Sequence, residues 1–314
     1  MNIHHRPSKP SAPSAVTIGN FDGVHAGHAA VLKRLVAMAN ERGLTPTVVT
    51  FAPNPKAYFA QMRGVALPTQ IMPLRDKVAA MKALGIAQVV VLPFDAHLAT
   101  MPAENFIQTI LCDTLKAKLL MVGDDFRFGA QRKGDFALLQ SLQNQYGYAL
   151  ENLHSVEQNG ARISSSNIRA HLAHGDMSEA TQLLGHPLTL SGHIIHGQKL
   201  GRTIGAPTIN IKMPEQIATQ GIYAVSVQLQ SVPEQTIQGA ANIGIRPSVK
   251  TNGQCWCEVH LFDFNQEIYG QIACVTLHQK IRDEAKFDDF DELLKAIQDD
   301  IVQCRAFFAQ AYYP

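Results

Sequence analysis

Apolar and polar positions alternate in two different ways along this chain, and the change falls near residue 185. Before it, short apolar runs are separated by helical patterns, the clearest of which contains Val31, Leu32, Leu35, Val36 and Ala39. The runs, residues 15–18, 47–51, 89–92 and 119–122, predict buried strands, and weaker helical patterns cover residues 77–84, 103–115 and 136–146. Strands that alternate with helices predict a parallel sheet covered on both faces, a Rossmann-like doubly wound α/β domain.

Beyond residue 185 the pattern changes to short runs in which apolar and polar residues alternate. Residues 272–277 predict one strand, and a second has Tyr223, Val225, Val227 and Leu229 on one face. In a third strand Cys255, Cys257, Val259 and Leu261 face one way, and Trp256, Glu258, His260 and Phe262 face the other. This series of short strands predicts a small β-barrel.

The last residues return to a helical pattern. Phe290, Leu293, Leu294, Ile297 and Ile301 lie at helical spacing, and Asp289 followed by Glu292 is a helix start signal. The predicted organisation is therefore an α/β domain over residues 1–185, followed by a β-barrel domain with a C-terminal helix over residues 186–314.

Composition narrows the classes of function. The 314 residues suffice for two domains, and a hydrophobic share of 46% lets each of them bury a core. The net charge of +1 lacks the basic excess that is typical of nucleic-acid-binding proteins. Small phosphorylated ligands are therefore expected rather than polymers.

The cysteine content and the hydropathy indicate in which cellular compartment the protein is expected. The five cysteines, Cys112, Cys255, Cys257, Cys274 and Cys304, are odd in number and lack framework spacing, which indicates a reducing compartment. The first 15 residues contain no apolar core of a signal peptide, and no apolar run is long enough to cross a bilayer. We expect a cytoplasmic protein without a membrane partner; no pattern indicates its oligomeric state.

A glycine- and histidine-rich segment follows the first predicted strand and leads into a helix. It reads Gly19-Asn20-Phe21-Asp22-Gly23-Val24-His25-Ala26-Gly27-His28. Free N–H groups at the start of a helix favour a bound anion, and glycines let the backbone approach it. A lone histidine is more often a surface or capping residue, but His25 and His28 bracket a glycine at this turn, which favours phosphate binding.

A second anion-binding pattern lies near the end of the same domain, in Ser164-Ser165-Ser166-Asn167-Ile168-Arg169. Hydroxyl groups before a helix are often simple N-caps. Here Ser165 and Ser166 precede Arg169 by four and three residues, which places them on one side of the helix. Together with the two histidines they form a candidate site for the phosphates of a nucleotide.

These residues resemble the nucleotidyltransferase superfamily, whose mark is His-x-Gly-His at the first strand–helix turn with a serine-rich partner. The longer match from Thr17 to His25, with Val122-Gly123-Asp124-Asp125-Phe126-Arg127-Phe128-Gly129, resembles the adenylyltransferase module of bacterial riboflavin kinase/FAD synthetases. The resemblance implies that the FMN phosphate attacks the α-phosphate of ATP and releases pyrophosphate. It also implies that His25 and His28 are catalytic, that Asp125 contacts the flavin, and that ATP contacts Gly19, Phe21, Gly23, Gly27, Ser165, Ser166 and Arg169.

One loop departs from this family. After the second strand the family often has Glu-Pro-His-Pro or Glu-Pro-Gln-Pro, whereas this chain has Ala52-Pro53-Asn54-Pro55. The prolines that shape the loop are kept, but a carboxylate is absent.

A second glycine-rich segment lies in the other domain and reads Gly201-Arg202-Thr203-Ile204-Gly205-Ala206-Pro207-Thr208-Ile209-Asn210. It is not a Walker loop, and an ordinary connection between strands is the alternative, yet closely spaced glycines expose several N–H groups to an anion. The segment resembles the riboflavin kinase signature, with Ile209 in place of an alanine. The resemblance implies phosphate contacts from Gly201, Arg202 and Gly205, and Mg²⁺ ligands from Thr208 and Asn210.

Two later motifs match the same family, Glu258-Val259-His260-Leu261-Phe262 and Lys280-Ile281-Arg282-Asp283-Glu284. A glutamate in a strand is normally a solvated side chain, but within this motif Glu258 is the candidate general base for a riboflavin hydroxyl. Arg282 is a candidate flavin contact; the alternative is that it pairs only with Asp283 or Glu284.

The leading hypothesis is a bifunctional flavin enzyme that uses ATP and Mg²⁺ to phosphorylate riboflavin to FMN and then adenylates FMN to FAD. The alternative keeps only the adenylyltransferase and makes the barrel a flavin-binding or sensing module; that reading favours loss of Glu258, Thr208 or Asn210, which are all present. A third hypothesis, a nucleic-acid-modifying protein, is disfavoured by the near-neutral charge.

Overall fold

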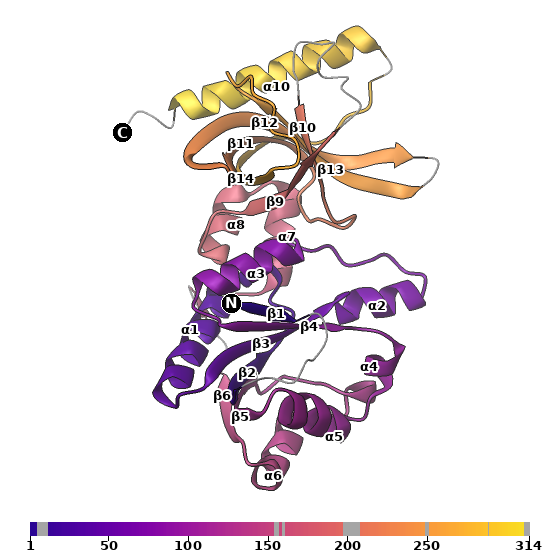
Figure 1. Cartoon of the computed structure of the whole chain (residues 1–314). Helices are drawn as coiled ribbons and strands as arrows, with labels where there is room; N and C mark the ends of the chain where they lie inside the picture. Colours follow the sequence, from indigo (N-terminus) through magenta and orange to yellow (C-terminus); the bar gives the residue numbers. More distant parts are fainter. Residues whose placement is uncertain are drawn as a thin grey trace. The chain divides into compact units, whose positions relative to one another are not determined.

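The computed structural model describes residues 1–4, 12–153, 157–158, 161–196, 208–248, 251–287 and 289–310. Contacts divide the chain into two compact units (Figure 1). The first comprises Met1–Pro68 and Lys77–Ser164, and the second comprises Thr69–Asp76 and Ser165–Pro314. These units are defined by contacts alone, so the domain ranges 1–185 and 186–314 stay a prediction.

The first unit is built on a parallel sheet of six strands in the order β1-β4-β3-β2-β5-β6. The strands are β1 (Asn2–His4), β2 (Ser14–Ile18), β3 (Thr45–Ala52), β4 (Gln88–Pro93), β5 (Ala117–Gly123) and β6 (Ala149–Leu153). Every residue of the central β2 is buried, as expected for a strand covered on both faces. The predicted α/β sheet is confirmed.

Helices connect these strands. They are η1 (Asp22–Val24), α1 (Ala26–Glu41), α2 (Pro55–Met62), α3 (Leu74–Ala83), α4 (Ala96–Thr100), α5 (Ala103–Asn105), the π-helix η2 (Phe106–Thr114), η3 (Ala130–Arg132) and α6 (Phe136–Tyr146). Right-handed crossovers place α1 and α3 on one face of the sheet and η2 and α6 on the other. The core on the second face joins Val16, Val49 and Leu120 of the sheet to Ile107 and Leu139 of the helices.

The second unit contains a closed barrel in the order β10-β13-β12-β11-β14-β9. Its strands are β9 (Thr189–Ile195), β10 (Thr208–Lys212), β11 (Gly221–Leu229), β12 (Val232–Ser248), β13 (Thr251–Leu261) and β14 (Ile272–Arg282). The helices α7 (Ser165–His174), α8 (Met177–Leu184) and α10 (Phe290–Gln310) belong to the same unit. The predicted barrel and C-terminal helix are confirmed; a short hairpin, β7 (Glu157–Gln158) with β8 (Ala161–Arg162), belongs to the first unit.

Strand β13 shows why the alternating pattern predicts this barrel. Cys255, Cys257, Val259 and Leu261 are buried inside it, whereas the side chains between them, Trp256, Glu258 and His260, are half-buried on the outside. Helix α10 covers part of the outer surface, where its Cys304 and Phe308 pack on strand residues. None of the helices in the described part of the chain combines the length and the apolar character that crossing a bilayer requires.

The turn after β5 requires glycine at position 129. Gly129 has a φ of +69°, and a Cβ added there would lie 2.6 Å from the Cα of Ala103. Gly43 is a matched control, because its φ of +63° is similar but a Cβ would meet no atom within 4 Å. We expect Gly43→Ala to cost about 1 kcal/mol of stability for the left-handed backbone, and Gly129→Ala to cost clearly more. Thermal unfolding of both variants measures this, and equal decreases in Tm would contradict it.

Candidate active sites

The loop between β2 and α1 lies at the point where the sheet changes direction. From β2 the chain winds outward through β3 to β4, then crosses back to β5 on the other side of β2. In parallel sheets ligands bind outside the carboxyl ends of the strands at such a switch point. The segment from Gly19 to His28 therefore occupies the position where this fold binds phosphorylated ligands.

The backbone of this loop is held in an uncommon conformation. Phe21, Gly23 and Val24 all have positive φ values, of 47°, 82° and 41°. Gly23 adopts this region freely, but a left-handed backbone at Phe21 and at the β-branched Val24 costs on the order of 1–3 kcal/mol each. A Cβ at Gly19 would lie 3.1 Å from the ring of Phe21, so that ring packs closely over the glycine. The fold maintains a strained loop at its ligand-binding edge.

The two histidines stack against each other at the start of α1. Their ring centroids are 3.6 Å apart with an interplanar angle of 18°, and the ring of Phe21 packs edge-on against His28 at 5.1 Å. His25 is the N-cap of α1, and its Nδ1 accepts a hydrogen bond of 3.3 Å from the backbone N–H of His28. This bond leaves Nε2 of His25 to carry the proton when the ring is neutral. The structure thus brings His25 and His28 together, as predicted.

His28 is held in its neutral form. Burial, followed by the charges of His25 and Lys77, keeps the pKa of His28 well below its usual value of 6.5. Its Nδ1 is buried and has no hydrogen-bond partner among the described residues. A neutral imidazole still has one N–H to donate, so this side chain remains suited to a phosphate oxygen.

Lys77 is a residue of this site that the sequence prediction missed. Its side chain is buried, and its Nζ donates a hydrogen bond of 2.8 Å to the backbone carbonyl of Asn20. The sequence held a signal for it, because Lys77 lies on the buried stripe of α3 with Val78 and Met81, where a cation is unexpected.

Aromatic side chains that sequence reasoning also missed cluster at the same edge of the sheet. Phe94 follows β4 and packs edge-on against Phe51 at 5.8 Å, and against Tyr58 and Phe59 of α2 at 5.4 and 5.8 Å. In the loop that departs from the family pattern, Asn54 caps α2 by accepting a hydrogen bond of 2.9 Å from the N–H of Lys56. The residue thus starts the helix that carries two of the aromatic rings.

The loop after β5 places Asp125 at this edge, exposed to solvent. A Cβ on Gly123 would lie 2.9 Å from its carboxylate, so the glycine makes room for it. Phe126 and Phe128 stack next to it with ring centroids 5.3 Å apart. A flavin contact for Asp125 stays a prediction.

The predicted serine and arginine residues lie in the first turns of α7. Arg169 donates a hydrogen bond of 3.2 Å to the hydroxyl of Ser166, which confirms that the two share one side of the helix. Contacts group α7 with the second compact unit. A joint site of Ser165, Ser166 and Arg169 with the histidines stays a prediction.

On the barrel, strand register aligns the predicted kinase residues. Asn210 of β10 lies directly opposite Glu258 of β13, and Glu258 lies opposite Asn242 of β12. Thr208 lies opposite His260, one pair further along the same face. Glu258 is therefore adjacent to Thr208 and Asn210, as the motifs predict.

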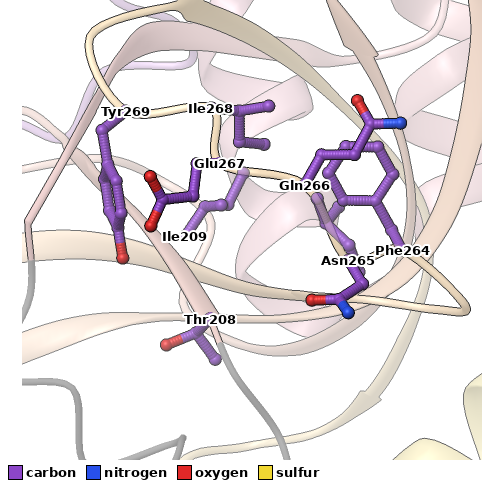
Figure 2. A pocket seen from close by; sticks show the side chains of 9 residues that line it. Thr208, Ile209, Phe264, Asn265, Gln266, Glu267, Ile268 and Tyr269 are labelled. Carbon is purple, nitrogen blue, oxygen red and sulfur yellow. The ribbon is translucent and has the colours of Figure 1, made fainter.

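Two cavities meet at Thr208. One, of about 440 Å³, is lined by Thr208, Ile209 and the loop from Phe264 to Tyr269 (Figure 2). The other, of about 280 Å³, is lined by Thr208, Glu258, Arg282, Phe287 and apolar residues of α10. In Figure 2, Glu267 and Tyr269 lie to one side of Thr208, and Phe264, Asn265 and Gln266 lie to the other.

The second cavity contains further charged groups. Arg282 is held by Asp300 of α10, to which Nε and one terminal nitrogen donate hydrogen bonds of 2.7 and 2.6 Å. The alternative of pairing only with Asp283 or Glu284 is wrong, because a carboxylate 18 residues away binds the guanidinium. Glu284 receives a hydrogen bond from the side chain of Asn242, while burial and the nearby Glu258 raise its pKa.

The phosphate-binding residues predicted on the glycine segment, Gly201, Arg202 and Gly205, lie outside the described residues. Within the described part of the chain, no group of three or more histidine, cysteine, aspartate or glutamate side chains is placed to hold a metal. Thr208 and Asn210 offer a hydroxyl and an amide oxygen on one face of β10, a donor set that suits Mg²⁺ when a nucleotide supplies the remaining oxygens.

Comparison with known proteins supplies two family matches. The model of FAD synthetases matches residues 8–167, and that of riboflavin kinases matches residues 184–308. The bifunctional riboflavin kinase/FMN adenylyltransferase of Haemophilus influenzae is 42% identical, covering 97% of each chain. The enzyme of that name from Escherichia coli K12 is 41% identical over 98% of this chain and 96% of its own. The chain belongs to the bifunctional riboflavin kinase/FMN adenylyltransferase family.

One solved structure is also similar to this chain over nearly its whole length. It is a macrolide-efflux protein from Streptococcus pneumoniae, 28% identical with a TM-score of 0.71. It covers 96% of each chain. The efflux activity in that name is a statement about the Streptococcus protein alone; for this family member, the likeness supports the α/β unit and the barrel that are described above.

The state of His28 predicts a pH dependence of stability in this enzyme. Its pKa is lowered in the folded protein, so the unfolded chain binds more protons once the pH falls below about 6.5. Folding is therefore expected to lose stability as the pH drops below this value, and the loss continues until the lowered pKa is reached. Thermal unfolding between pH 7.5 and 5 measures it in the parent and in His28→Gln, which is expected to show a shallower decline. An identical decline in both would contradict the assignment to His28.

Proposed function

We propose that this chain makes FAD in two steps. The barrel phosphorylates riboflavin with ATP, and the α/β unit transfers the adenylyl group of a second ATP to the resulting FMN. Both halves match models of enzymes, and Thr208, Asn210 and Glu258 are adjacent on the barrel. These observations favour two activities over a barrel that only senses flavin.

The kinase proposal is carried by the position of Thr208 where two cavities meet. A phosphoryl group has to pass from ATP to an alcohol, so the two substrates need neighbouring sites with the γ-phosphate between them. The cavity of Figure 2, with Tyr269 and polar side chains around it, suits the nucleotide. The cavity between the barrel and α10, with Phe287 and apolar helix residues, suits the riboflavin ring.

Glu258 is the general base of this step. It lines the flavin-side cavity, and Thr208 lines both cavities. As the riboflavin hydroxyl oxygen bonds to the γ-phosphorus of ATP, its proton passes to the Glu258 carboxylate and ADP leaves. Arg282, fixed by Asp300, lies in the same cavity and contacts the flavin through the edge of its guanidinium.

Thr208 and Asn210 would hold Mg²⁺ at the kinase site. When bound with ATP, the ion neutralises charge on the transferring phosphates. Thr208 contributes its hydroxyl and Asn210 its amide oxygen, and Gly201, Arg202 and Gly205 bind phosphate oxygens.

Adenylyl transfer takes place at the loop between β2 and α1. A phosphate oxygen of FMN attacks the α-phosphorus of ATP, and pyrophosphate leaves. His25 and His28 donate hydrogen bonds to the α-phosphate, supported by the N–H groups at the start of α1 and the contacts of Gly19, Phe21, Gly23 and Gly27. Ser165, Ser166 and Arg169 hold the pyrophosphate end.

The flavin of this second step binds at the aromatic cluster. Phe51, Phe94, Tyr58 and Phe59 lie at the carboxyl edge of β3 and β4, next to the phosphate-binding loop of β2. Their ring faces suit a flat isoalloxazine ring, and Asp125 lies in the loop after β5 at the same edge. Because both steps consume ATP, we place the enzyme in the cytoplasm.

Glu258→Gln tests the kinase step. The amide keeps the shape of the side chain but cannot accept the proton, so riboflavin phosphorylation is expected to fall by ~10²–10⁴-fold. FAD formation from supplied FMN is expected to match the parent, because Glu258 has no part in that step. Chromatographic separation of flavins after incubation with ATP and Mg²⁺ measures both rates. Parental conversion of riboflavin would remove Glu258 from its role.

His28→Ala tests the adenylyl transfer. Loss of one phosphate donor is expected to slow the FMN to FAD conversion by ~10²–10³-fold. The variant should therefore accumulate FMN when supplied with riboflavin, whereas the parent converts it on to FAD. The same flavin separation reads this out, and a variant that forms FAD at the parental rate would show that His28 has no part in the reaction.

A further inference from the structure

A cation is buried against the phosphate-binding loop, and the reaction outlined above does not yet use it. Lys77 has 8% of its surface exposed, and burial lowers its pKa while the neighbouring Asp22 raises it. A buried charge is costly for a fold to keep unless it is paired or hydrogen-bonded. The position of this lysine therefore indicates a specific task.

Its contact is with the backbone of the loop. The Nζ of Lys77 donates a 2.8 Å hydrogen bond to the carbonyl of Asn20, to which the hydroxyl of Thr50 also donates, at 3.5 Å. Asn20 directly precedes Phe21, which together with Val24 lies in the left-handed backbone region. Lys77 thus secures the carbonyl from which the strained turn begins.

Two buried polar atoms in this loop have no partner among the described residues. They are the side-chain oxygen of Asn20 and Nδ1 of His28. Buried polar groups are nearly always satisfied, so orphaned atoms in one short loop indicate a place reserved for a ligand. Lys77 lies close enough to influence His28, since its charge is one of the causes of the lowered pKa of that histidine.

We propose that Lys77 is a positioning residue for adenylyl transfer, which holds the loop from Gly19 to His28 in its strained form and adds positive charge behind the phosphate site. In this role it acts through the Asn20 carbonyl and the histidines. A loop fixed before ATP arrives needs no reorganisation in the transition state. The inference rests on the proposed adenylyltransferase function.

The test compares Lys77→Met, which removes the charge and the donor, with Lys77→Arg, which keeps both. Lys33→Met is the control, because Lys33 is exposed on α1 of the same unit. Initial rates of FAD formation from FMN are measured over a range of ATP concentrations, together with riboflavin phosphorylation and thermal unfolding of the same preparations. Titration of His28 by NMR supplies a readout that a merely structural lysine would not move.

We expect Lys77→Met to lower kcat/KM for ATP in FAD formation by ~100-fold, the size of effect that misplaced catalytic groups produce. Riboflavin phosphorylation should remain parental, Lys77→Arg should recover part of the loss, and Lys33→Met should behave like the parent. Without the Lys77 charge, His28 should also titrate at a higher pH.

Parental kcat/KM in Lys77→Met, or an unchanged His28 titration, would overturn the proposal. Equal losses of activity and Tm in both Lys77 variants would reduce the lysine to a structural role and overturn it as well. A parent chain that makes no FAD at all would instead refute the underlying function, so the two failures are distinguishable.

Discussion

The kinase half depends on the period of two in strand β13. Cys255, Cys257 and Val259 fill the barrel interior, so the residues between them must face outward. Pairing with β10 then fixes Glu258 opposite Asn210, and pairing with β12 fixes it opposite Asn242. A slip of one residue would bury the carboxylate and expose the thiols. Core packing therefore determines where Glu258, the proposed general base, lies.

A related constraint shapes the α/β half. Strand order, rather than strand pleat, determines which loops meet, because the carboxyl ends of β2, β3 and β5 lie next to one another. One loop supplies stacked histidines, another leads into the aromatic cluster, and a third carries Asp125. His25 in one unit and Asn210 in the other, both assigned to phosphate chemistry, are each held by a hydrogen bond before a substrate binds.

Much of the fold and of the candidate sites was predictable, because the sequence signals that indicate them are local. Helix α6 matches its predicted range since Asp135 caps one end and Gly147 ends the other in a left-handed conformation. The turn that carries His25 and His28 was also predicted from a local motif. Residues 103–115 form α5 and a π-helix instead of one regular helix, because apolar spacing does not reveal the hydrogen-bond register. Two contacts were not predicted: the hydrogen bond from Lys77 to the carbonyl of Asn20, and the ion pair of Arg282 with Asp300. Each of them joins residues that are distant in the sequence.

The segment Thr69–Asp76 belongs by its contacts to the barrel unit although it lies early in the chain. Gln70 exchanges backbone hydrogen bonds of 2.7 and 2.8 Å with Gln216 and Ala218, and the carboxylate of Asp76 accepts from both the N–H and the hydroxyl of Ser191. A kinase fragment cut from the second half alone would lack this segment, and the backbone groups of Gln216 and Ala218 would lose their hydrogen-bond partners. A barrel fragment that keeps these contacts would have this stretch grafted onto it or supplied as a peptide.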